Sequence, residues 1–197
     1  MTTQSTIRRP QAARRALPWA LGLALLGLMA TPATANDAPN WTLTDATGQE
    51  YSFHQEHPKG PSIVLFWATW CPYCKALMPH LQSMLEEYRG EQALRVYAIS
   101  FREDGDPLKY LERQGFSFIA FPEGGDDVAS AYDVSGTPGL FVVDAGGRIV
   151  LNLYKVTAAM STDPEWESLN NRQKAARRAP YWGARIREAL DRLYTAP

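Results

Sequence analysis

The chain has 197 residues, of which 45% are hydrophobic and 21% are charged, and its formal net charge at pH 7 is −1. The first 35 residues hold four arginines and no acidic residue, so the rest of the chain carries a net charge of −5. A mildly acidic chain lacks the basic patch that nucleic-acid binding requires, and we expect no such partner.

The first 35 residues have the pattern of an export signal. Four arginines between positions 8 and 15 precede an apolar stretch at 17–30, and small residues at 33–35 come just before Asn36. The apolar stretch is shorter than the roughly 20 residues that a membrane-spanning helix needs, so we predict a signal peptide and a periplasmic protein. The alternative is an uncleaved anchor in the inner membrane, formed by residues 16–35.

The remaining residues suit a single domain with a hydrophobic core, and its first half alternates strand and helix patterns. In chain order we expect a β-hairpin over 41–53, a loop over 54–61, a buried strand over 63–67, a helix over 72–89 and a second buried strand over 94–100. Pro79 lies inside the helix and is expected to kink it.

The second half of the domain ends in a hairpin. We expect a helix over 106–113 that Gly115 stops, an extended segment over 116–121, a short helix over 126–132, and strands over 139–143 and 148–156. Strands that first alternate with helices and then pair directly predict an α/β fold with a mixed sheet. In such sheets the site lies at the carboxyl end of a central strand.

The chain continues beyond this pattern. Thr162–Glu165 is a helix-start signal, and the charged run that follows is expected to end before Pro180. Residues 181–194 predict a last amphipathic helix that covers the sheet. The segment 157–180 is longer than the fold needs, and we interpret it as a solvated decoration, with docking of a partner as the alternative.

Cys71 and Cys74 are the only cysteines, and they stand between the buried strand and the helix. The first turn of a helix offers unpaired backbone N–H groups and the positive end of the helix dipole, which favour a thiolate over a thiol. The thiolate is the form that attacks disulfides. An exported protein with structural disulfides would normally spread them along the chain, so one close pair indicates a redox centre that cycles.

Other uses of the cysteine pair fit less well. A structural disulfide across so short a loop stabilises by only about 2 kcal/mol. A zinc site needs two more ligands, and His54, His57 and His80 lack the spacing for it. Haem attachment needs a histidine where Lys75 stands. We expect no metal and no cofactor, with His54 and His57 as solvated loop residues and His80 on the helix surface rather than a catalytic base.

Three segments carry a resemblance to a known family. Leu65–Cys71 matches the active-site run of the thioredoxin superfamily, Pro79 falls where that family has its helix-kinking proline, and Asp133–Asp144 resembles the segment with its cis-proline. Over Trp41–Tyr154 the chain is similar to the TlpA/ResA-type exported thiol-disulfide oxidoreductases. The resemblance implies a thioredoxin fold, an α/β architecture with a mixed central sheet flanked by helices.

The resemblance also implies domains and partners. Residues 36–156 would form the thioredoxin-like core, with the β-hairpin at its start, and residues 157–197 a helical extension that includes the last core helix. The partners would be protein thiols or disulfides and a membrane electron donor, for cytochrome c maturation or periplasmic redox homeostasis. The protein would be a monomer.

By the same resemblance, Cys71 would be the nucleophile and Cys74 the resolving thiol. Thr137 and Pro138 would be joined by a cis peptide bond that lies against the sulfur pair. The residues implied in binding the substrate are Trp70, Pro72, Tyr73, Thr137 and Pro138.

Two departures from the family leave questions open. Leu65 stands where thioredoxin has a buried aspartate, and Leu77 where many ResA-like proteins have a glutamate. The proton acceptor for Cys74 therefore lies open between water, Lys75 acting electrostatically, and Glu86 or Glu87.

Two other functions stay open. One is an oxidant or isomerase, which Thr137 before the proline would suit, and the other is a copper-binding or redox-sensing module, since paired thiolates bind Cu(I).

Overall fold

The computed structural model describes residues 1, 36–90, 92–156 and 165–195. The described residues from 36 onward belong to one compact unit, Ala33–Pro197. The predicted signal peptide or anchor, apart from Met1, lies outside the described residues, as does the start of the predicted extension, 157–164. Within the described part of the chain, no helix is both long and apolar enough to cross a membrane.

A five-stranded mixed sheet forms the centre of the unit, as predicted. The strand order is β5-β4-β3-β6-β7, in which β3 pairs parallel with β4 and antiparallel with β6. The strands are β3 (Ser62–Trp67), β4 (Arg95–Ser100), β5 (Ile119–Phe121), β6 (Gly139–Val143) and β7 (Ile149–Asn152).

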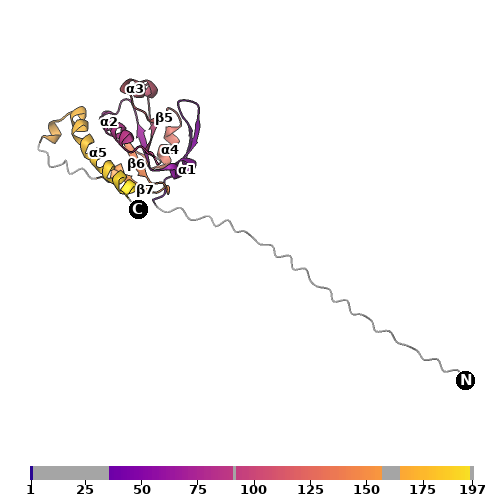
Figure 1. Ribbon diagram of the computed structural model, residues 1–197. Coiled ribbons are helices and arrows are strands. Elements are labelled where there is room, and N and C mark those ends of the chain that lie inside the picture. The colour runs from indigo at the N-terminus through magenta and orange to yellow at the C-terminus, as the bar shows by residue number, and fades with distance from the viewer. Residues whose placement is uncertain (2–35, 91, 157–164, 196–197) are drawn as a thin grey trace. The chain divides into compact units, whose positions relative to one another are not determined.

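The central strand β3 is buried over its whole length because hydrophobic cores cover both faces of the sheet. Ile63, Leu65 and Trp67 point into a core made with α2 (Pro72–Glu87), α3 (Pro107–Gln114) and α5 (Asn171–Thr195). Val64 and Phe66 point into the opposite core. Figure 1 shows α2 and α5 on one side of the sheet and α1 (Phe53–Glu56) and α4 (Gly125–Ala131) on the other.

The second core is mainly aromatic, and the N-terminal hairpin covers it. Strands β1 (Thr42–Thr44) and β2 (Glu50–Ser52) pair antiparallel, as predicted. The rings of Trp41 and Phe53, at the two ends of the hairpin, stack with their centroids 5.2 Å apart. Trp41 also meets Phe121 edge to face, so the hairpin is held by its aromatic side chains as well as by its ladder.

The prediction of a loop over 54–61 was wrong, because this segment holds most of α1 and a 3-10 helix, η1 (His57–Lys59). Buried Phe53 anchors the start of α1, and Lys59 forms an ion pair with Glu56 at 2.6 Å. His54 is exposed, as expected, but His57 is half-buried, with Nδ1 3.2 Å from the carbonyl oxygen of Ala145.

The helix-boundary signals of the middle of the chain are confirmed. The Asp106 side chain accepts a hydrogen bond from the Lys109 N–H at 2.9 Å and so caps α3, while Gly115 ends this helix with a φ of 69°. The helix α2 contains Pro79 and ends at Glu87, two residues earlier than predicted. The strand predicted over 148–156 was too long, because β7 ends at Asn152 and a second 3-10 helix, η2 (Leu153–Lys155), follows it.

The C-terminal segment differs most from the prediction. Instead of a charged run that stops before Pro180 and a separate helix, α5 is one helix of 25 residues with Pro180 inside it. It starts at Asn171, well after the predicted start signal. Pro180 is exposed, and its neighbours Ala179 and Gly183 are buried against the core. Small residues let α5 pack closely on α2, and this packing outweighs the loss of one helical hydrogen bond.

Replacing Pro180 with alanine is expected to stabilise the protein by about 1–3 kcal/mol, because alanine restores a backbone donor and removes the penalty of proline in a helix interior. The free energy of unfolding in urea measures the change. Ala184→Gly, at an exposed position one turn further along α5, is the matched control. It should destabilise by about 1 kcal/mol and so confirm that unfolding reports on this helix. A less stable Pro180→Ala protein would contradict the prediction.

Candidate active site

The two cysteines lie where β3 ends and α2 begins. Cys71 is the N-cap residue of α2 with an extended backbone, and Pro72 occupies the first turn, where its missing N–H is not needed. Cys71 and Cys74 are joined by a disulfide, with their Cα atoms 5.3 Å apart, so the structure shows the oxidised form. The Cys71 Sγ accepts a hydrogen bond from the backbone N–H of Cys74 at 3.1 Å.

Both cysteines are buried, but their surroundings differ. Cys74 is fully buried among the apolar side chains between the sheet and α2. Cys71 follows Trp70, whose side chain is 50% exposed and whose indole N–H donates to the carbonyl oxygen of Arg102 at 2.9 Å. Cys71 itself is as buried as Cys74, but the residue before it in the chain is exposed.

The peptide bond between Thr137 and Pro138 is cis, as the resemblance implied. Because Gly139 pairs with Phe66 in the sheet, Pro138 lies near the carboxyl end of β3, the end from which the chain runs on to Cys71. Thr137 is half-buried, and its hydroxyl oxygen has no hydrogen-bond partner.

Two residues that the sequence reasoning missed hold the loops of this site. Tyr154 receives a hydrogen bond from the N–H of Gly136 at 3.3 Å, and its hydroxyl donates to the carbonyl oxygen of the same residue. It thereby fixes the chain just before the cis peptide. Nothing in the sequence pattern signals this contact, because it joins positions 18 residues apart in an irregular segment.

Glu103 is the second missed residue. Its carboxylate accepts hydrogen bonds from the N–H and the hydroxyl of Thr69, at 2.7 and 2.5 Å, and from the N–H groups of Asp104 and Gly105. Burial raises the pKa of Glu103, but the four hydrogen bonds outweigh it and lower the pKa overall. An ionised Glu103 therefore ties the loop after β4 to the loop that leads to Cys71.

The two carboxylates considered as proton acceptors do not reach Cys74. Glu86 accepts a hydrogen bond from Gln82, and Glu87 pairs with Arg187. Both stand at the far end of α2, about 18 Å along the helix from Cys74 at 1.5 Å per residue. The Lys75 side chain is exposed, with Nζ 5.1 Å from the centre of the Tyr110 ring. The proposal that Glu86 or Glu87 reaches in was therefore wrong.

His80 is half-buried and lies against α5, where its ring and Cβ surround the position of Gly183. It therefore lies in the contact between α2 and α5 and not on the open helix surface that was expected. Within residues 36–90, 92–156 and 165–195, no group of three or more histidine, cysteine or acidic side chains could hold a metal ion.

The C-terminal segment contributes side chains to the site, so its interpretation as a solvated decoration was wrong for the part that is described. The Arg178 guanidinium lies 5.8 Å from the ring of Tyr73, the residue between the cysteines. Trp182 lies 6.0 Å from the same ring. Helical spacing brings Arg178 and Trp182 to one face of α5, and that face meets the start of α2.

Two grooves flank the dithiol, and α5 lines both. One, of about 330 Å³, is bounded by Thr137, Pro138, Leu153, Tyr154, Val156, Arg178 and Trp182. The other, of about 380 Å³, is bounded by Trp70, Pro72, Lys75 and Arg172. Four of the five residues predicted to bind substrate therefore line a groove, and the fifth, Tyr73, packs against Arg178.

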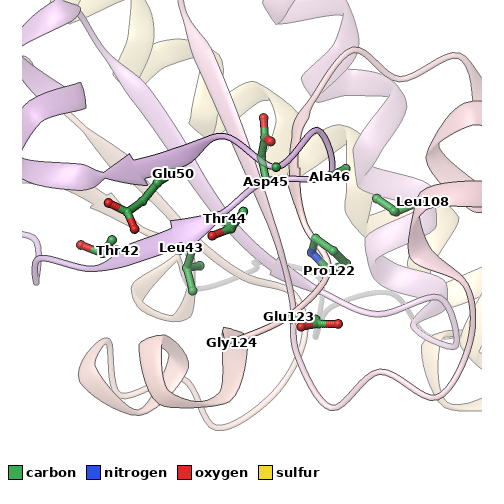
Figure 2. Close-up of a pocket in the computed structure, with 11 residues that line it drawn as sticks. Thr42, Leu43, Thr44, Asp45, Ala46, Glu50, Leu108, Pro122, Glu123 and Gly124 are labelled. Atoms are coloured by element: carbon green, nitrogen blue, oxygen red, sulfur yellow. The ribbon is translucent and has the colours of Figure 1, made fainter.

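A further groove of about 600 Å³ lies between the hairpin, Leu108 of α3 and the loop Pro122–Gly124. Figure 2 shows its acidic side chains Asp45, Glu50 and Glu123. None of the predicted site residues lines it, so it is separate from the cysteines.

A thioredoxin fold with a two-cysteine redox pair at the end of its central strand defines a class, the thiol:disulfide oxidoreductases. Comparison with known proteins agrees with this class. Residues 34–152 match the AhpC/TSA family, and the chain belongs to that family.

Individual relatives are similar over the same region. The chain is 30% identical over 118 residues to the thiol-disulfide oxidoreductase ResA of Geobacillus kaustophilus, covering 59% of this chain and 67% of that protein. It is 28% identical over 116 residues to ResA of Bacillus subtilis, covering 58% and 64%. The chain thus spans about two thirds of the length of these relatives. A thiol:disulfide interchange protein from Bacteroides sp. superposes with a TM-score of 0.53 at 26% identity, covering 61% and 80%.

Replacing Glu103 with glutamine is expected to destabilise the protein by about 1–2 kcal/mol at neutral pH, because an amide nitrogen then faces one of the N–H donors. The hydrogen bonds stabilise the fold while Glu103 is ionised, so this stabilisation is lost as the pH falls through its lowered pKa. Urea unfolding at neutral pH and at about pH 3 should therefore show a gap between wild type and variant that narrows in acid. An unchanged gap would show that the charge of Glu103 contributes nothing.

Proposed function

We propose that this protein reduces disulfides in client proteins outside the cytoplasm through the Cys71–Cys74 pair. The Cys71 thiolate attacks one sulfur of the client disulfide, a mixed disulfide forms, and the other client sulfur leaves as a thiolate. The Cys74 thiolate then attacks Cys71 and releases the second client sulfur. The client gains two electrons and two protons, and the protein ends in the disulfide form.

The hydrogen bond from the Cys74 N–H to the Cys71 Sγ is the observation that carries this assignment. In the reduced protein the same donor and the start of α2 would stabilise a thiolate on Cys71. Cys74 lies inside α2, three residues after the N-cap position, so the start of the helix is closer to Cys71. This difference supports Cys71 as the nucleophile and Cys74 as the resolving thiol.

The client segment is proposed to lie along the surface formed by Trp70, Pro72, Tyr73, Thr137 and Pro138. The exposure of the Trp70 ring and the two grooves beside the dithiol support this placement. An extended segment there would bring its disulfide to Cys71. Thr137 lines one of these grooves, and its buried hydroxyl has no hydrogen-bond partner.

The wider setting follows from the sequence pattern and the relatives. Residues 1–35 are proposed as a signal peptide or anchor, residues 36–156 as the catalytic core and residues 157–197 as its extension. A reductant in the periplasm must itself be reduced, so a membrane electron donor is part of the proposal. The clients are proposed to be proteins of cytochrome c maturation or periplasmic redox homeostasis, and the protein acts as a monomer.

Thr137 before the proline favours a second candidate, a disulfide oxidant or isomerase. The reduction potential separates the two directions. We expect a value near thioredoxin's of about −270 mV, measured by equilibration with glutathione or dithiothreitol, whereas a value near about −120 mV would make the protein an oxidant.

Replacing Cys74 with serine should trap the clients. Without the resolving thiol, and with no third cysteine in the chain, the mixed disulfide at Cys71 cannot be released within the protein. Expression in an exporting cell should yield covalent complexes that reductant dissolves, and mass spectrometry would identify the client and the donor.

Cys71→Ser is the matched control and should trap little, because Cys74 lies inside α2 rather than at its start. Capture by Cys71→Ser alone would reverse the two roles. If neither variant captures a protein, disulfide exchange with proteins is not the function.

A further inference from the structure

Among the residues that the structure describes, one cationic side chain beside the dithiol has no anionic partner. Arg178 of α5 is half-buried, and in the described part of the chain no carboxylate lies within salt-bridge distance of it. Its Nε atom is buried and has no hydrogen-bond partner. The other arginine of the same turn, Arg177, pairs with Glu165 at 3.2 Å. A half-buried guanidinium without a carboxylate is unusual, because burying a charge is unfavourable unless it is paired.

Three aromatic rings hold this guanidinium in place. Its central carbon lies 4.8 Å from the ring centre of Trp166, 5.5 Å from that of Trp182 and 5.8 Å from that of Tyr73. Cation–π contacts do not use the N–H donors of a guanidinium, so the terminal NH₂ groups of Arg178, which are not among the buried unpaired atoms, stay available for hydrogen bonds. Arg178 lines the groove beside Thr137 and Pro138, and no acidic residue of the described ranges lines that groove.

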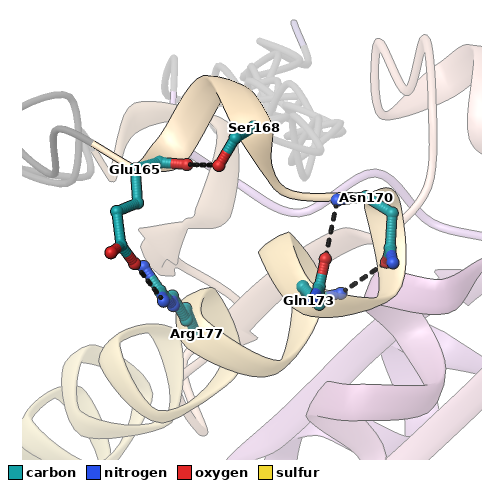
Figure 3. A network of polar contacts seen from close by, with 5 residues as sticks. All are labelled: Glu165, Ser168, Asn170, Gln173 and Arg177. Carbon is teal, nitrogen blue, oxygen red and sulfur yellow. Dashed lines mark hydrogen bonds and ion pairs between the residues drawn. The ribbon is translucent and has the colours of Figure 1, made fainter.

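A network of polar contacts fixes the segment that supplies Trp166. Asn170 and Gln173 each accept a hydrogen bond from the backbone N–H of the other, at 2.9 and 3.0 Å, and so form a capping box at the start of α5 (Figure 3). The Ser168 hydroxyl donates to the carbonyl oxygen of Glu165 at 2.7 Å, while the Glu165 side chain pairs with Arg177. The 3-10 helix η4 (Trp166–Ser168) is therefore held against the first turns of α5.

We propose that Arg178, held by Trp166, Trp182 and Tyr73, is a carboxylate-binding subsite of the substrate groove. It would select substrates that carry a carboxylate close to the disulfide sulfur. A carboxylate fits because its two oxygens match the paired donors of a guanidinium edge, and it would supply the charge that Arg178 lacks. The inference rests on the proposed disulfide exchange, since it defines which disulfides that site accepts.

The test uses the full-length protein and two disulfide-closed peptides that differ at one position next to a cysteine, which is glutamate in one and glutamine in the other. Wild type should reduce the glutamate peptide with a kcat/KM about tenfold higher, the size expected for a charge-assisted hydrogen bond. Arg178→Gln should bring the ratio of the two values to about one, and Arg178→Lys should keep part of the preference because it keeps the charge.

Arg185→Gln is the matched control. Arg185 lies on the same helix, pairs with Glu188 and stands away from both grooves, so its loss should leave the ratio as in wild type. A wild-type ratio near one would overturn the proposal, and so would a ratio unchanged in Arg178→Gln. A merely structural role of Arg178 would lower both rates and leave the ratio intact.

The same peptides in their dithiol form are offered to the oxidised protein. If the protein oxidises the glutamate peptide faster than the glutamine peptide but reduces neither disulfide peptide, the result would support the subsite and contradict the reductant function. Glutathione disulfide, which also carries carboxylates, is the third substrate. If Arg178→Gln lowers kcat/KM for glutathione disulfide and not for the glutamate peptide, the carboxylate belongs to a small thiol rather than to a protein client.

Discussion

The complete burial of β3 is the constraint on which the rest of the structure depends. A strand with apolar side chains on both faces needs a layer on each side, and the chain supplies an aromatic layer under the hairpin and an aliphatic layer under α2 and α5. The strand ends at Trp67, and four residues later Cys71 caps the next helix. The position of the dithiol is thus set by the packing of the central strand, and both cysteines belong to the core on one face of the sheet.

Elements with their own local signal could be predicted from the sequence. The run Ser62–Trp67, the capping residue Asp106 and the glycine stop at Gly115 each carry a short-range cause, and the structure shows each in its expected place. The extent of α5 was mispredicted because Pro180 is a strong local signal for a helix end. The packing of Ala179 and Gly183, which keeps the helix continuous, depends on tertiary contacts that the local sequence does not show. Asn170 and Gln173, which do start this helix, also form a recognisable capping pair.

The residues of the site also divide into those with a local sequence signal and those that only tertiary contacts reveal. Cys71 and Cys74 could be found from their spacing and their place between strand and helix, and Pro138 from the resemblance. Glu103 and Tyr154 could not, because each acts through contacts between loops that are distant in the sequence. Arg178 looked like part of a solvated charged run. Only the approach of α5 to α2 shows that this residue faces Tyr73.

The first residues of the folded unit lie at the two edges of the sheet, where another copy of the chain could add a strand. The outer strands of an open sheet expose unpaired backbone groups that can recruit a strand from another chain. Here the Ile149 N–H donates to the carbonyl oxygen of Asn36 at 2.7 Å, so the leading segment occupies part of the outer side of β7. At the opposite border, the N–H of Ala46 in the hairpin turn donates to the carbonyl oxygen of Ala120 in β5 at 3.0 Å. Residues 36–46 therefore occupy part of both edges of the sheet and leave less of each edge open to strand addition by another copy.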